Sequence, residues 1–205
     1  MTFVFDLGGV LVDIDVQGFL KRFAALMPTG RSSGFDPGEL LGGGGDSFLH
    51  DYEMGYITTE QAMTHFHQLC RPDVSDDTIR EVWNSELGII CEQTKTILRQ
   101  LKQEGHTLFL LSNTNAMHWE GYILPMFCEG GYSIHQYFNK LFLSYEYHFF
   151  KPQPEFYAEI EKWIPQGEEV VYIDDVERNR LAAPKTWRTF ASVEEMINMM
   201  RLCEN

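Results

Sequence analysis

Residues 3–13 read Phe-Val-Phe-Asp-Leu-Gly-Gly-Val-Leu-Val-Asp, and the interpretation of the whole chain starts from them. The apolar run at their start has no polar alternation, which is typical of a strand buried on both faces of a parallel sheet. Asp6 ends that run, at the position where open parallel α/β sheets bind ligands. Gly8 and Gly9 permit a sharp turn and leave backbone amides available to an anion. An ordinary Asx turn explains the same residues equally well. Only the rest of the chain can distinguish a ligand-binding site from an ordinary turn here.

The composition narrows the class of protein. The chain has 205 residues and a formal net charge of -14, which argues against a nucleic acid or an anionic membrane as a partner. An anionic substrate would therefore need a local cation, such as a metal ion or a single lysine. The cysteines lie far apart without paired spacing, as in reduced cytosolic proteins, and no apolar run approaches membrane length. We expect a cytoplasmic protein, a monomer or weak dimer, without a nucleic-acid or membrane partner.

Residues 15–88 carry helical periodicity and no strand pattern. Apolar residues recur at spacings of three and four from Val16 onward. Thr58 and Gln61 form a capping-box pattern, and Ser75 can cap a further helix. This pattern predicts an all-helical insert between the first strand and the remainder of the sheet.

A glycine-rich segment, residues 28–45, interrupts this insert and contains the uninterrupted glycine run 42–45. It predicts a flexible loop, with a short helix possible at 39–41. It is not a nucleotide-binding P-loop, because no Gly-Lys-Ser/Thr follows.

From residue 89 onward, helices and strands alternate. Helices are expected over 92–104, after Lys151-Pro152 and from about Val193, whereas residues 116–139 look aromatic and irregular. Alternation of this kind predicts a parallel sheet with right-handed crossovers. The expected strands are 107–111, 141–144, 170–173 and a short one near 189–190.

Polar residues follow several of these strands. Asp6, Ser112 and Asp174-Asp175 stand at strand ends, and Lys151 lies just beyond another strand. Each alone could be an ordinary turn residue, but the carboxyl ends of parallel strands meet at one edge. Carboxylates gathered there repel one another unless a cation is present, and their hard oxygens suit Mg²⁺. Lys151 and the groups at Ser112 could hold phosphate oxygens, leaving a carboxylate that faces an electrophile.

These motifs resemble those of the haloacid dehalogenase superfamily of hydrolases over nearly the full chain. Asp6-Leu7-Gly8-Gly9-Val10 resembles the first motif, Ser112-Asn113 the second and Lys151-Pro152 the third. Asp174-Asp175, followed by Asn179, resembles the acidic fourth motif. The resemblance implies an α/β fold: a Rossmann-like parallel sheet core with an inserted all-helical cap. The core would comprise residues 1–14 and 89–205, and the cap residues 15–88.

The resemblance also implies a function. It indicates a Mg²⁺-dependent phosphomonoester hydrolase that acts on a small phosphorylated metabolite, such as a sugar phosphate, through an aspartyl-phosphate. Sugar-phosphate phosphatases whose first motif also reads Asp-Leu-Gly are the most similar group. By the resemblance, Asp6 and Lys151 are catalytic, and Ser112, Asn113 and Lys151 bind phosphate. The implied Mg²⁺ ligands are Asp6, the backbone carbonyl of Gly8, Asp174 and Asp175.

The chain departs from the family pattern at three places. Gly8 stands where most phosphatases of the family carry an acid–base Asp, residues 148–150 replace a glycine-containing segment, and Trp187 stands where glycine is common. Asp13 and Asp15 are the nearest acids to replace the missing one, although we expect them to shape the turn and the cap entrance. Gly8 supports one alternative, a weakly active or inactive binding or regulatory protein. A second is 2-haloacid dehalogenation, which needs no metal.

Overall fold

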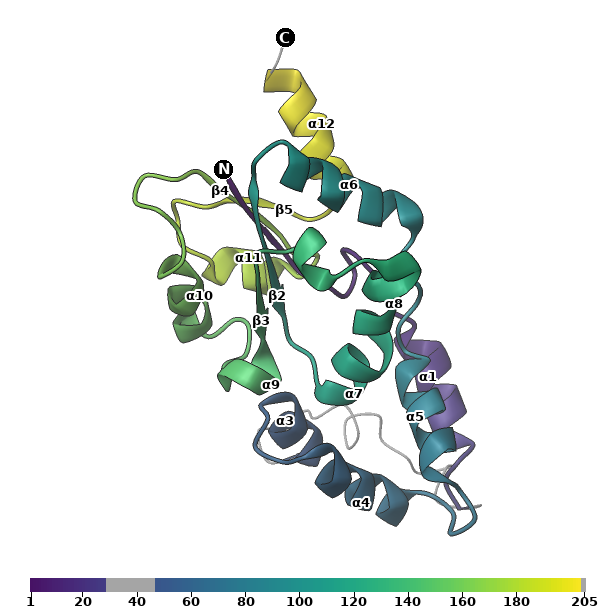
Figure 1. The fold of residues 1–205 in the computed structure, drawn as a ribbon. Helices are drawn as coiled ribbons and strands as arrows, with labels where there is room; N and C mark the ends of the chain where they lie inside the picture. Colours follow the sequence, from purple (N-terminus) through teal and green to yellow (C-terminus); the bar gives the residue numbers. More distant parts are fainter. Residues whose placement is uncertain (29–46, 204–205) are drawn as a thin grey trace.

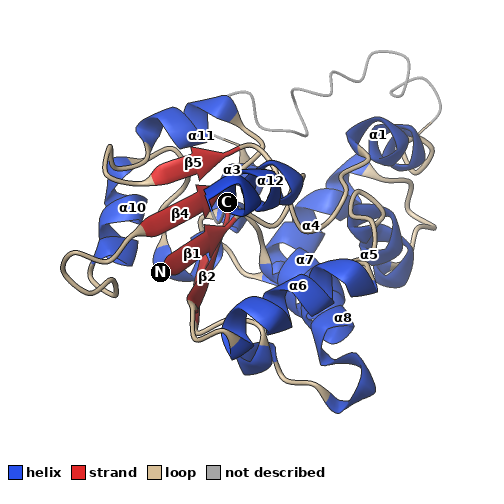
Figure 2. Cartoon of the chain, turned by 90° about the horizontal axis from the view of Figure 1, so that it is seen from above, coloured by secondary structure: helices blue, strands red, loops and turns tan. Residues whose placement is uncertain are grey.

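The computed structural model describes residues 1–28 and 47–203. The glycine run 42–45 and the short helix expected at 39–41 lie outside these residues. A five-stranded parallel sheet forms the centre, in the order β3-β2-β1-β4-β5 (Figure 2). The predicted α/β fold class is thus confirmed. The strands are β1 (Thr2–Phe5), β2 (Thr107–Ser112), β3 (Lys140–Leu143), β4 (Val170–Ile173) and β5 (Arg188–Phe190).

Helices cover both faces of the sheet, which is why its central strands are apolar on both faces. On one face, α6 (Glu92–Gln103) and α8 (Leu124–Cys128) pack on alternate strand residues such as Phe3 and Phe5. On the other, α10 (Pro154–Glu161) packs against Val4 and its neighbours, beside α11 (Glu177–Ala182) (Figure 1). The last helix, α12 (Val193–Cys203), follows β5 and adds Met196 to the first of these cores.

Within the described residues, four helices form the inserted cap, which lies below the sheet in Figure 1 and has a core of its own. Aromatic residues contact one another in that core; for example, Phe19 and Phe66 both contact the Trp83 ring. The capping box between Thr58 and Gln61 is formed as predicted. The helices are α1 (Val16–Ala24), α3 (Phe48–Glu53), α4 (Thr59–Leu69) and α5 (Asp76–Asn84).

The segment that the sequence suggested to be irregular, residues 116–139, instead contains short helical turns. They begin with α7 (Ala116–His118) and the π-helical turn η1 (Trp119–Ile123), continue into α8, and end with η2 (Glu129–Gly131) and η3 (Ile134–Gln136). A π-helical turn does not follow the 3.6-residue period, so the spacing of its buried residues hides the helix from periodicity arguments.

Hydrogen bonds fasten the cap to the start of this segment. The Tyr52 hydroxyl accepts a hydrogen bond from the Met117 N–H at 2.9 Å. The Trp83 indole donates to the Asn115 side-chain oxygen at 3.3 Å, and the buried His118 ring lies 3.2 Å from the Trp83 carbonyl. Because this segment directly follows β2, the cap is held next to the carboxyl edge of the sheet.

No helix in the part of the chain that the structure describes is long and apolar enough to cross a membrane.

Candidate active site

The strand register brings two aspartates together at the carboxyl edge of the sheet. Phe5 pairs with Leu110 of β2 and with Ile173 of β4. The residues that follow on β1 and β4, Asp6 and Asp174, therefore lie side by side, and the Asp6 N–H donates to the Ile173 carbonyl at 2.8 Å. Adjacent parallel strands thus produce the convergence that the sequence predicted.

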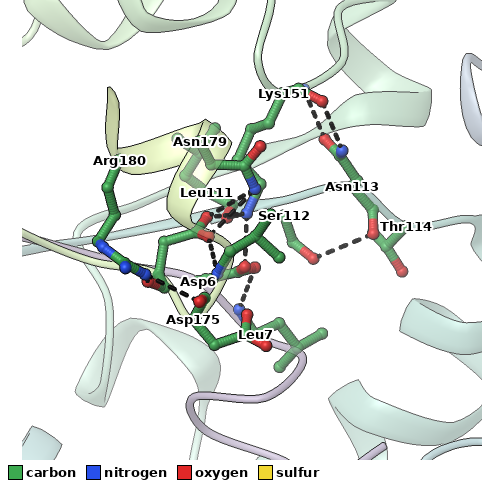
Figure 3. A network of polar contacts seen from close by, with 12 residues as sticks. Asp6, Leu7, Leu111, Ser112, Asn113, Thr114, Lys151, Asp175, Asn179 and Arg180 are labelled. Carbon is green, nitrogen blue, oxygen red and sulfur yellow. Dashed lines mark hydrogen bonds and ion pairs between the residues drawn. The ribbon is translucent and has the colours of Figure 1, made fainter. Parts of the chain in front are cut away.

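Lys151 lies at the centre of the site (Figure 3). Its buried ammonium is 2.7 Å from Asp6 Oδ2 and 2.8 Å from Asp174 Oδ2, and it donates to the Leu111 carbonyl at 3.2 Å. The Asn113 side chain fixes the Lys151 backbone, because its oxygen accepts from the Lys151 N–H at 2.8 Å and its amide donates to the Lys151 carbonyl at 3.1 Å. Asn113 thus positions the lysine, a contact that the sequence did not reveal.

Asp174 is fully buried and has a complete set of hydrogen-bond donors. Besides Lys151, it accepts from the Tyr172 hydroxyl at 2.5 Å, the Asn179 amide at 3.1 Å and the Val176 N–H at 2.9 Å. Burial favours the neutral acid, but the Lys151 charge and these hydrogen bonds outweigh it, so the pKa of Asp174 lies below its usual range. Asp174 is therefore held as a carboxylate.

Asp6 has fewer stabilising contacts. Its Oδ1 accepts a hydrogen bond from the Leu7 N–H at 2.6 Å. Burial raises the pKa of Asp6 to about 7; Lys151 opposes this effect, and the neighbouring Asp174 adds to it. Asp175 is exposed, yet partial desolvation and the charge of Asp174 raise its pKa as well. The negative charge of Asp174 is therefore well stabilised, whereas those of Asp6 and Asp175 are not.

The carboxylates of Asp6, Asp174 and Asp175 can each offer an oxygen such that all three oxygens lie within 4.8 Å of one another. The Lys151 ammonium contacts two of them, Asp6 and Asp174, whereas the Arg180 guanidinium donates to the backbone carbonyls of Asp174 and Asp175. Clustered carboxylate oxygens are the donor set that hard divalent cations such as Mg²⁺ prefer. The residues present therefore fit a divalent cation.

The remaining predicted residues surround this cluster. Ser112 is buried at the end of β2, with its hydroxyl 3.4 Å from the Asn113 carbonyl. Gly8 lies in the turn after β1 and pairs with Val12. The next glycine, Gly9, has a φ of +72°, and a Cβ there would lie 2.3 Å from Asp175 Oδ2, so this turn approaches the acidic cluster closely.

Asp13 and Asp15, the acids suggested as substitutes for the missing side chain, make contacts at the cap entrance. Asp15 caps α1 by accepting from the Gly18 N–H at 2.8 Å and pairs with Arg22. The exposed Asp13 belongs to the cap entrance, where its carbonyl accepts from the Gly88 N–H at 2.8 Å. Both shape the chain crossing, as the sequence suggested.

Trp187, which stands near the fourth motif where glycine is common in the family, packs against residues that contact the site. Its ring packs edge-on against Tyr157 and Tyr172, and the Tyr157 hydroxyl donates to the Asn179 carbonyl at 2.9 Å. Both tyrosines thus link this aromatic cluster to Asp174 and its partner Asn179. A glycine at position 187 would leave that cluster without its third ring.

Sequence reasoning missed two carboxyl groups of the cap. Glu53 ends α3 and Glu86 follows α5, and both line a cavity of about 230 Å³ between the cap and the core. Two larger cavities, of about 420 and 430 Å³, are lined by none of the predicted site residues. Nothing in the sequence around either glutamate distinguishes it from a solvated helix residue, because only the packing of the cap brings them together.

Comparison with known proteins identifies the family of this chain. A family model for haloacid dehalogenase-like hydrolases matches residues 1–185. A D-ribitol-5-phosphate phosphatase of Bacteroides thetaiotaomicron is 26% identical over 179 residues, which is 86% of this chain and 83% of that protein.

Solved structures show the same fold. A HAD family enzyme from B. thetaiotaomicron in complex with magnesium superposes with a TM-score of 0.82 at 28% identity, covering 98% of both chains. The same enzyme in complex with magnesium and inorganic phosphate superposes with a TM-score of 0.79 at 29% identity, covering 92% of each chain. A HAD-like hydrolase from Porphyromonas gingivalis, at 22% identity, shares the fold with a TM-score of 0.79 over 100% of this chain and 98% of its own. With the family model spanning both the cap and all four motifs, the chain belongs to the haloacid dehalogenase-like hydrolases.

Proposed function

We propose that the protein hydrolyses the phosphomonoester of a small phosphorylated metabolite, a sugar phosphate being the favoured class, with Mg²⁺ as cofactor. The observation that carries this proposal is the buried Lys151 ammonium between Asp6 and Asp174, beside a third carboxylate at Asp175. Two further findings support it: the similarity to a D-ribitol-5-phosphate phosphatase, and the magnesium and phosphate bound by a related enzyme.

Asp6 acts as the nucleophile in this proposal. One of its carboxylate oxygens attacks phosphorus in line, forming an O–P bond while the bond to the leaving-group oxygen breaks. The leaving oxygen takes up a proton, and water then attacks the aspartyl-phosphate, releasing inorganic phosphate and regenerating Asp6. Lys151, the Ser112 hydroxyl and the backbone N–H of Asn113 bind the phosphoryl oxygens and stabilise the charge they carry.

Asp6, the Gly8 carbonyl, Asp174 and Asp175 are the proposed ligands of Mg²⁺. When bound, the cation supplies positive charge near the transferring phosphoryl group. The hydrogen bonds from Tyr172 and Asn179 hold Asp174 in place for this role. We also propose that the core comprises residues 1–14 and 89–205 and the cap residues 15–88.

Phosphate release with and without Mg²⁺, measured beside halide release from a 2-haloacid, separates the alternatives. We expect phosphate release that requires Mg²⁺ and is lost in Asp6→Asn. Halide release without metal would identify a dehalogenase, a chemistry that gives no reason for the acidic cluster. Absence of both products, with retained binding of a phosphorylated ligand, would identify the binding protein that Gly8 suggested.

A further inference from the structure

The cavity between the cap and the core lies next to the proposed phosphate site. On the core side it is lined by Phe150, which directly precedes Lys151, and by Arg178, which directly precedes the Asp174 partner Asn179. Its position is therefore where the leaving group of a phosphomonoester held by Lys151 would extend. Its volume of about 230 Å³ is below the ~300 Å³ at which pockets for drug-sized ligands begin. A small leaving group fits this space.

Glu53 is fixed at the cap side of the cavity by its backbone. The Ser144 hydroxyl donates to the Glu53 carbonyl at 2.7 Å and lies 2.9 Å from both the N–H and the carbonyl of Thr114. Ser144 directly follows β3, and Thr114 lies two residues beyond the end of β2. The end of α3 is therefore tied to the same sheet edge that carries the proposed catalytic residues.

The Glu53 and Glu86 carboxyl groups have few protein partners. Glu53 makes no side-chain hydrogen bond within residues 1–28 and 47–203, and burial together with the charge of Glu86 raises its pKa to about 7. The Glu86 carboxylate lies 4.0 Å from the His118 ring, and burial raises its pKa as well. A partly buried polar group without a partner costs about 1–3 kcal/mol, so a ligand that satisfies it gains affinity.

We propose that Glu53 and Glu86 bind the hydroxyl groups of an uncharged polyol or sugar leaving group and thereby determine substrate specificity. This inference rests on the proposed phosphatase function. A hydroxyl group both donates and accepts, so it can pair with a carboxylate, with a neutral carboxyl group or with the Arg178 guanidinium. The rings of Trp83 and Phe150 line the same cavity and offer apolar surface to the carbon chain.

The charges of the cavity disfavour an anionic leaving group. A leaving group with its own carboxylate would be repelled by Glu53 and Glu86. A phosphorylated polyol has no charge beyond its phosphate and many hydroxyl groups. It is therefore the class that this cavity can both admit and hydrogen-bond.

The test compares two classes of substrate in the full-length protein with Mg²⁺. The first class is a panel of pentitol, pentose and hexose phosphates that includes D-ribitol 5-phosphate. The second is phenyl phosphate, whose leaving group carries no hydroxyl besides the reacting oxygen. We expect Glu53→Ala and Glu86→Ala to reduce kcat/KM on the best sugar phosphate about tenfold more than on phenyl phosphate, mainly through KM. Glu53→Gln, which keeps hydrogen-bonding capacity, should recover part of the loss.

Glu81→Ala is the matched control, because Glu81 is exposed on α5 and does not line the cavity. It should leave both rates unchanged. Equal losses on the two substrates, or no loss on either, would overturn the specificity assignment. So would hydrolysis of phenyl phosphate with no hydrolysis of any sugar phosphate, although the phosphatase function itself would stand. If the wild type hydrolyses no phosphomonoester, the proposed function fails first. Melting temperatures identify any variant that does not fold.

Discussion

The Lys151 ammonium lies 2.7 Å from the Asp6 carboxylate, in a site where both side chains are almost entirely buried. The same ammonium contacts Asp174 at 2.8 Å, so one lysine faces two carboxylates at hydrogen-bond distance. Lys151 therefore cannot neutralise both aspartates. The excess of negative charge favours the binding of a further cation. Without that cation, the ionised form of Asp6 is destabilised.

Asp6→Asn should abolish turnover while preserving the fold. The amide is nearly isosteric with the carboxyl group but cannot form the aspartyl-phosphate. We expect kcat to fall at least about a thousandfold. Without Mg²⁺ the melting temperature should stay the same or rise, because the change removes a buried and poorly compensated charge. Activity assays and melting curves in EDTA measure both effects.

Asp77→Asn is a suitable control for this experiment, since Asp77 is an exposed acid in the first turn of α5. Its activity should match the wild type. If Asp6→Asn kept more than about a tenth of the wild-type rate, another group would have to be the nucleophile.

Mg²⁺ should stabilise the folded protein, because the three carboxylates converge only in the native state. A ligand at about a hundred times its dissociation constant adds about 2.7 kcal/mol to the free energy of unfolding. Melting curves in EDTA and in millimolar Mg²⁺ should differ clearly for the wild type and much less for Asp175→Asn. Asp175 is the best position for this variant because it is exposed, whereas truncation of Asp174 would remove one of the two buried carboxylates that pair with Lys151. A Mg²⁺ response of equal size in both proteins would place the ion elsewhere.

Local pattern predicted the sheet and the residues at its carboxyl edge. The apolar runs before Asp6 and Asp174 are buried on both faces, and parallel pairing then brings the two acids together without further information. The capping box at Thr58 and Gln61 involves residues three positions apart, so it too could be predicted from the sequence.

Contacts between distant segments could not be predicted in this way. The side chain of Asn113 holds the backbone of Lys151, 38 residues further along the chain, although the sequence pattern indicates only a phosphate-binding residue. Glu53 ends α3 and Glu86 follows α5, and they share a cavity only because both helices pack against the core. No periodicity within either helix specifies that packing.

His118 should make the protein less stable in mild acid. The ring is buried and stacks on Trp83 at 4.9 Å, and this burial lowers its pKa to about 4, while a hydrogen bond with the Trp83 carbonyl partly opposes the shift. The unfolded chain, with a histidine pKa near 6.5, binds the proton more readily than the folded one. The contribution of His118 to stability is therefore complete above pH 6.5 and is lost as the pH falls toward 4.

Urea unfolding at pH 7.5 and pH 4.5 measures this effect. The wild type should lose about 2–3 kcal/mol more between the two values than His118→Gln, since each unit of pKa shift corresponds to ~1.4 kcal/mol. Other titrating groups are common to both proteins and cancel in the difference. His135→Gln, at an exposed position, should behave as the wild type. Parallel pH dependences in the wild type and His118→Gln would contradict the assignment.

Gly8→Asp should raise turnover of substrates with poor leaving groups. An aspartate at this position could protonate the leaving oxygen, an effect typically worth about two to four powers of ten. The turn can accept the side chain, because among residues 1–28 and 47–203 a Cβ at Gly8 would meet only the Ile14 side chain, at 2.4 Å from its Cδ1 and 3.3 Å from its Cγ1. Ile14 is 45% exposed, so its side chain has room to move.

The expected gain is selective. An alkyl phosphate needs protonation of its leaving oxygen far more than phenyl phosphate does, so kcat on a sugar phosphate should rise at least about tenfold relative to phenyl phosphate. Gly8→Asn is the matched control, because it has nearly the same shape and lacks an acidic proton. Equal gains in Gly8→Asp and Gly8→Asn would show that shape, not acid catalysis, is responsible. No gain in Gly8→Asp would mean that proton transfer to the leaving group is not limiting, and that the wild type already obtains this proton from another group.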